Sequence, residues 1–209
     1  MFLEKGLNRI VVYGKGIVRD APNVAFVVVG VETEGKEVEQ VQTENAEKMQ
    51  SILSVLQQEG IPNELIRTIE YQLQPIYDFH NNQQLFSHYR LTHLLEVEIE
   101  DIQKTGQVLD KVVQAGANRT QSVQFKSNRE NQLYRQALTK AVEDAKKKAI
   151  ELAASNQVKL KQTPLLIHEQ GQVAQPFSPR LQTFEAASTP ISTGLLAIEA
   201  NVEVVYEYE

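Results

Sequence analysis

Long alternation of apolar and polar residues is the feature that most constrains this chain. It runs through residues 68–79, again through 90–100, and again through 196–208. Successive side chains of a β-strand point to opposite faces, so each stretch predicts a strand with one apolar and one polar face. We therefore expect a fold built mainly on antiparallel sheet, in which one face packs on a core and the other meets water.

The first two of these stretches predict a long hairpin, because the polar residues 80–84 lie between them. Pro75 cannot donate a ladder hydrogen bond, so its strand is expected at a sheet edge or bulged at that point. Aromatic side chains and one histidine flank the turn: Tyr77, Phe79, His80, Phe86 and Tyr89. We predict that they form an interface, with ordinary sheet core as the alternative.

Three helices are predicted from apolar spacings of three and four residues. The first covers 37–58 and ends at Gly60, and the second follows Asp101 as N-cap and ends at Gly116. The third covers 130–155 and carries an alanine at every fourth position: Ala137, Ala141, Ala145, Ala149 and Ala153. A ridge of small residues lets a helix pack closely against a sheet or another helix.

The remaining segments complete the order ββαββαβαββ. Residues 10–18 predict a strand that Gly14 and Gly16 interrupt with a bulge, and residues 24–31 predict a central strand. Further strands are expected near 123–125 and 158–169. The connection 170–193 exceeds the roughly 12–15 residues of ordinary loops and is expected to be mobile or functional.

This order predicts an α+β fold. Residues 24–127 have the split βαβ (ferredoxin-like) pattern, and a third long helix and two C-terminal strands extend it. No segment has the composition of a linker, so we expect a single domain over 1–209 with two possible lobes, 24–127 and 128–209.

Composition excludes several classes of function. The chain has no cysteine, which excludes disulfides, thiolate metal sites and cysteine nucleophiles. A net charge of −6 disfavours nucleic acid as a partner, and no apolar run reaches the ~20 residues of a transmembrane helix. The first residues show no export signal, which favours the cytoplasm. Removal of such a signal would instead make the protein periplasmic or cell-surface.

A search for catalytic, metal or cofactor sites finds none. Gly14-Lys15-Gly16 lacks the spacing of a phosphate-binding loop, and no G-x-S-x-G elbow is present. Glu96, Glu98 and Glu100 lie on one strand face, where solubilising acids are the better interpretation. The histidines show no metal-ligand spacing: His80, His88, His93 and His168. His93 shares a face with apolar residues and is predicted to be a satisfied core or interface histidine.

Several short motifs, in order, resemble the SIMPL family over essentially the whole chain. They include residues 10–16, Ala21-Pro22-Asn23, the turn Ala115-Gly116-Ala117-Asn118 and the alanine-rich helix. The family usually has Asp where this chain has Asn23, and its bacterial members usually carry an export signal.

The resemblance implies a non-enzymatic protein that acts as a homo-oligomer, in a ring-like or channel-like form, with links to stress tolerance. It supplies no catalytic residues and no cofactor. The alternative is a small-ligand-binding protein, or an enzyme whose site forms between subunits. His168, Arg180 and the loop to Thr193 would line such a site.

Overall fold

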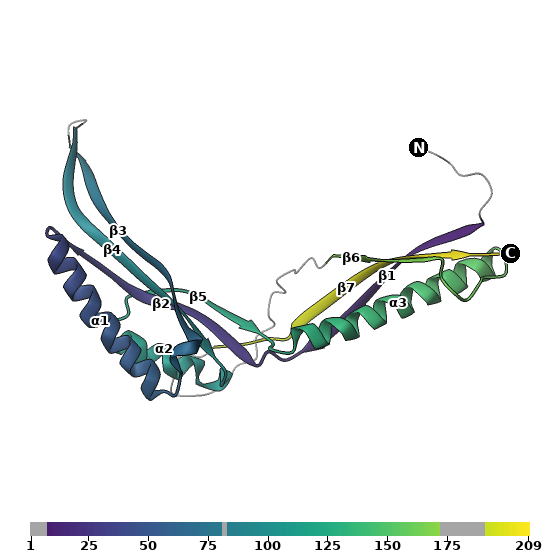
Figure 1. The fold of residues 1–209 in the computed structure, drawn as a ribbon, viewed down its shortest axis with the longest axis horizontal. Helices are drawn as coiled ribbons and strands as arrows, with labels where there is room; N and C mark the ends of the chain where they lie inside the picture. Colours follow the sequence, from purple (N-terminus) through teal and green to yellow (C-terminus); the bar gives the residue numbers. More distant parts are fainter. Residues whose placement is uncertain (1–7, 81–82, 172–190) are drawn as a thin grey trace. The chain divides into compact units, whose positions relative to one another are not determined.

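The computed structural model describes residues 8–80, 83–171 and 191–209, which form two compact units (Figure 1). The described residues of unit 1 fall within Met1–Ala21, Ser127–Arg180 and Gly194–Glu209, and those of unit 2 within Pro22–Lys126 and Leu181–Thr193. The predicted α+β class with mainly antiparallel sheets is confirmed. Most of the connection 170–193 lies outside the described residues.

Unit 2 is a four-stranded antiparallel sheet with two helices. The strand order is β3-β4-β2-β5, with β2 central and β3 at an edge. Chain order and sheet order together are those of the split βαβ fold. The elements are β2 (Val24–Gly35), α1 (Val38–Gln58), β3 (Ile66–His80), β4 (Gln83–Ile99), α2 (Thr105–Gln114) and β5 (Arg119–Lys126), with 3₁₀ turns at Asn63–Leu65 and Ile102–Lys104.

The core of unit 2 lies between one face of this sheet and both helices. Alternate residues of β2 and β4 meet the apolar stripes of α1 and α2, as the period-two and helical patterns require. Gly60 and Gly116 end the two helices with φ of 83° and 111°, the left-handed conformation predicted for them. Asp101 caps the 3₁₀ turn by accepting from the Gln103 amide, and α2 itself begins at Thr105.

Unit 1 is a three-stranded antiparallel sheet with one long helix. The order is β1-β7-β6, so the C-terminal strands form a second sheet together with the N-terminal strand. The elements are β1 (Arg9–Asp20), α3 (Glu130–Ser155), β6 (Leu166–Gln170) and β7 (Leu196–Glu207). The strand predicted over 158–169 is shorter than expected, because Pro164 lacks an amide donor and the pairing with β7 changes register around it.

The glycines of β1 do not mark a bulge, which corrects the prediction from sequence. β1 pairs with β7 in unbroken register along its whole length. A Cβ on Gly14 would lie 2.0 Å from the carbonyl oxygen of Ala141, and one on Gly16 would lie 1.9 Å from that of Ala137. The alanine ridge of α3 therefore rests directly on the backbone of β1, and both glycines are required for that close approach.

Candidate interaction surface

The β3–β4 hairpin extends past the sheet that it belongs to (Figure 1). β4 pairs with β2 only as far as Tyr89, opposite Gly35. Beyond this point, among the strands that the structure describes, β3 and β4 pair only with each other, over residues 76–80 and 83–88, which we call the hairpin tip. A two-stranded ribbon without a third strand is at best marginally stable in water, so the tip depends on its own side-chain contacts.

An aromatic cluster provides these contacts. Tyr77 lies opposite Phe86 with ring centroids 6.1 Å apart, and Phe86 meets Tyr89 at 4.9 Å. Each such pair contributes about 0.5–1.5 kcal/mol beyond simple burial. The cluster nevertheless stays open to water, because Tyr77 is 44% and Phe86 46% exposed, while Phe79 is 75% exposed.

A β-bulge creates the Tyr77–Phe86 pair. The register shifts after Ile76, which pairs with His88, so that Ser87 is the extra residue and Tyr77 lies opposite Phe86. The bulged strand is β4, while Pro75 lies on the edge strand β3, one of the two positions predicted for that proline. Without the extra residue, Tyr77 would face a serine and the aromatic cluster would not form.

The structure brings together three of the five predicted interface residues, namely Tyr77, Phe86 and Tyr89. Phe79 and His80 lie exposed toward the end of the ribbon. Leu85, opposite Asp78, is also exposed and belongs to this surface. Sequence reasoning missed Leu85 because it followed only the aromatic residues around the turn, although its place next to Phe86 was a usable signal.

His93, predicted to be a satisfied core or interface histidine, is half-buried and has a side-chain partner. Its Nδ1 lies 3.2 Å from Oδ1 of Asn45, and Tyr71 packs edge-on against its ring at 5.0 Å. Burial lowers the pKa of His93, because removal from water disfavours the charged imidazolium. The neutral ring is therefore a structural partner of α1.

Asn45 connects this histidine to the core. It is 1% exposed, and its side-chain amide donates to the Val31 carbonyl at 3.4 Å and to the Thr33 hydroxyl at 3.3 Å. Thr33 in turn donates to the Val41 carbonyl. The polar network was not predicted, although a polar residue four positions after Val41 in the buried stripe of α1 was a signal for it.

Charged side chains near the base of the hairpin form ion pairs. Arg90 bonds Glu34 at 2.6 Å, and Arg119 bonds Glu32 at 2.9 Å. The hydrogen bond from Arg90 lowers the pKa of Glu34, so this carboxylate stays ionised. Farther along β4, Glu96 pairs with Arg67 at 2.7 Å. These acids are held by cations and show no pairing suited to acid–base catalysis.

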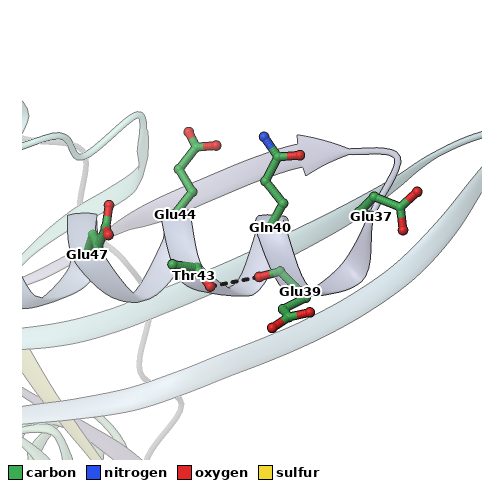
Figure 2. Close-up of a pocket in the computed structure, with 6 residues that line it drawn as sticks. All are labelled: Glu37, Glu39, Gln40, Thr43, Glu44 and Glu47. Carbon is green, nitrogen blue, oxygen red and sulfur yellow. Dashed lines mark hydrogen bonds between the residues drawn. The ribbon is translucent and has the colours of Figure 1, made fainter.

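A shallow hollow of about 530 Å³ lies along the start of α1. Figure 2 shows its lining side chains, which project outward from a single helix: Glu37, Glu39, Gln40, Thr43, Glu44 and Glu47. The Thr43 hydroxyl donates to the Glu39 carbonyl of the same helix. No second element contributes to this lining, so polar groups do not converge as they do in a binding pocket.

Within the described residues, the structure shows no pocket formed by the residues predicted to bind a ligand. His168 is exposed on β6, in unit 1, whereas the hollow on α1 belongs to unit 2. Arg180 lies outside the described residues. In the part of the chain that the structure describes, no helix is both long and apolar enough to cross a bilayer.

Comparison with known proteins finds one family model that covers both units. The family model SIMPL, described as a protein of unknown function (DUF541), matches residues 10–206, from β1 to β7. The chain belongs to the SIMPL family. The matched residues include both sheets and the hairpin of this chain.

Two SIMPL relatives are similar over nearly the whole chain. The 26 kDa periplasmic immunogenic protein of Brucella melitensis is 27% identical over 95% of this chain and 84% of its own length. The uncharacterized protein YggE of Escherichia coli is 24% identical over 96% of this chain and 83% of its own length.

Proposed function

We propose that this protein is a non-enzymatic assembly protein whose copies associate through the hairpin tip. The observation that carries the proposal is a ribbon that no third strand of the described residues joins, with a half-exposed aromatic cluster on it. Aromatic side chains are the commonest anchors of protein interfaces. Because ring contacts already hold Tyr77, Phe86 and Tyr89 in place, these side chains lose little further freedom on binding.

Two features support a role without catalysis. The acids near the hairpin are paired with arginines, and His93 is engaged by Asn45. Neither arrangement presents a nucleophile or a proton-transfer group to a pocket. The family resemblance further predicts a link to stress tolerance, which a growth comparison of cells with and without the gene would check.

The periplasm is the proposed location. The Brucella relative is named as periplasmic, and this supports the alternative raised from the family's usual export signal. The expectation of a cytoplasmic protein finds no support among the relatives. Fractionation of cells that express the complete gene would test the location, with a periplasmic and a cytoplasmic marker protein as controls.

The assembly proposal predicts a discrete multimer in solution. Light scattering coupled to size exclusion, at two concentrations tenfold apart, should give a mass well above the 23.6 kDa of one chain. A tip variant, Phe79→Glu with Leu85→Glu, should shift that mass to the monomer, because both residues are exposed and the charges would oppose burial.

Val113→Glu is the matched control, since Val113 is also an exposed apolar residue of unit 2 but lies on α2. It should leave the mass unchanged. A wild-type monomer at both concentrations, or a tip variant that keeps the wild-type mass, would contradict assembly through the hairpin tip.

A further inference from the structure

Strand β6 begins with two apolar residues, Leu166 and Ile167, although it lies at an edge. All five of its residues are exposed, and β7 is its neighbour on one side. Leu166 and Ile167 point to opposite faces, and each is about half exposed. Strands that are apolar on both faces normally have neighbours and covering layers on both sides. Within the described residues, no strand pairs with the outer edge of β6.

The opposite edge of the same sheet is closed. Three side chains of α3, one turn apart, bond the free backbone groups of β1: Lys140 to the Ile17 carbonyl at 3.4 Å, Asp144 to the Lys15 amide at 2.9 Å, and Lys148 to the Tyr13 carbonyl at 2.8 Å. Such capping prevents another strand from adding to an edge. The sheet of unit 1 is therefore open to strand addition at β6 and guarded at β1.

The hairpin tip also has a strand edge that no described strand pairs with. β2 ends opposite Tyr89, so among the described residues no strand pairs with the edge of β4 over residues 83–88 where the line of β2 would continue. This edge is six residues long and β6 is five. Neither segment contains a lysine, an arginine or a proline, the residues that commonly block strand edges. The β3 edge is less suitable, because Pro75 precedes it and lacks an amide donor. The bulge residue Ser87 is on β4, so the regular part of the accepting edge is residues 83–86.

We propose that β6 of one copy adds to the β4 edge of the hairpin tip of a second copy, as the third strand of the ribbon. This inference rests on the proposed function and names the surface that receives the tip. Backbone hydrogen bonds would satisfy both edges, and the two apolar faces of β6 would extend the exposed apolar surface around Leu85 and Phe86. The contact joins two different surfaces, so it is head-to-tail.

A mixing experiment tests this contact. A β6 variant, Leu166→Lys with Ile167→Lys, and the tip variant described above should each be monomeric alone. Mixed in equal amounts, they should form a pair of twice the 23.6 kDa chain mass, because one copy supplies an intact tip and the other an intact β6. Ile150→Lys, an exposed apolar position on α3 in the same unit as β6, is the control and should assemble like wild type.

The outcomes separate the two proposals. If the tip variant is monomeric while the β6 variant keeps the wild-type mass, the tip binds elsewhere and the β6 contact is overturned. If both variants are monomeric but do not pair when mixed, the head-to-tail arrangement is overturned. A tip variant that keeps the wild-type mass overturns the proposed function itself.

Cross-linking provides a second test that does not depend on losing assembly. The chain has no cysteine, so single introduced thiols are unambiguous. Ile167→Cys on one tagged copy and Leu85→Cys on another should be joined by a short bismaleimide in the mixture. Ile150→Cys with Leu85→Cys should not be joined, and equal yields for the two pairs would overturn the proposed contact.

Discussion

At the scale of single residues, a few positions fix how the layers meet. Gly14 and Gly16 allow the backbone of α3 to rest on β1, and Asn45 joins α1 to the neighbouring strands of unit 2. At each of these positions, the residue type is required by a contact with residues distant in the sequence. This explains why the glycines suggested a bulge when only the chain around them was considered.

Gly16→Ala should destabilise the protein by about 1–3 kcal/mol or more, the usual cost of overpacking. The added carbon would meet the backbone of Ala137, which cannot rotate away as a side chain could. Gly171→Ala is the control, since a carbon there meets nothing within 4 Å. Urea unfolding would measure both free energies, and equal values would contradict the close packing of α3 on β1.

The His93 site should make stability depend on pH. Burial lowers its folded pKa below the ordinary 6.5, so the unfolded chain takes up a proton first as pH falls. The contribution of His93 to the free energy of unfolding is fully present above pH 6.5, and it is lost as the pH falls toward the folded pKa. Urea midpoints between pH 7.5 and 5 should show this loss, and His93→Gln should reduce it. His80→Gln, at an exposed position, should leave the slope unchanged.

At the scale of elements, local sequence patterns predicted the helices and strands better than they predicted how the strands pair. The helix over 130–155 was predicted to the residue, because its alanine period is a property of the segment itself. The strand over 158–169 was not, because its length depends on how it pairs with β7. At the candidate surface, the aromatic residues were visible in the sequence. The bulge that sets Tyr77 opposite Phe86 was not, since it exists only in the pairing of two strands.

The three α3 side chains that bond the edge of β1 can be tested by removing them. Replacing Lys140, Asp144 and Lys148 with alanine removes the three bonds to β1 while keeping helix-favouring residues on α3. The exposed edge should then promote association beyond the wild-type mass, seen as growth in light scattering over hours. Glu143, Lys147 and Glu151 have the same spacing on α3, and their alanine triple variant is the control. Identical scattering from the two variants would show that these three side chains do not prevent association at the β1 edge.

At the scale of the whole molecule, the sequence indicated the split βαβ unit but not the second sheet. All helices and strands of unit 2 come from one continuous segment, Pro22–Lys126, whose element order alone predicts the split βαβ pattern. Unit 1 requires Arg9 to lie opposite Glu207, and no local pattern connects two strands so far apart. The SIMPL match over 10–206 covers both of these strands.

The pairing of β1 with β7 also sets an order of folding. The helices and strands of unit 2 lie between β1 and α3 in the chain, so they can form on the ribosome while β1 still lacks its partner. Unit 1 can close only after β7 emerges, near the end of synthesis. Closing so long a loop is entropically costly for a flexible chain, and an already folded unit 2 leaves far fewer flexible residues within it. We therefore expect the early folding of these elements to lower the entropic cost of pairing β1 with β7.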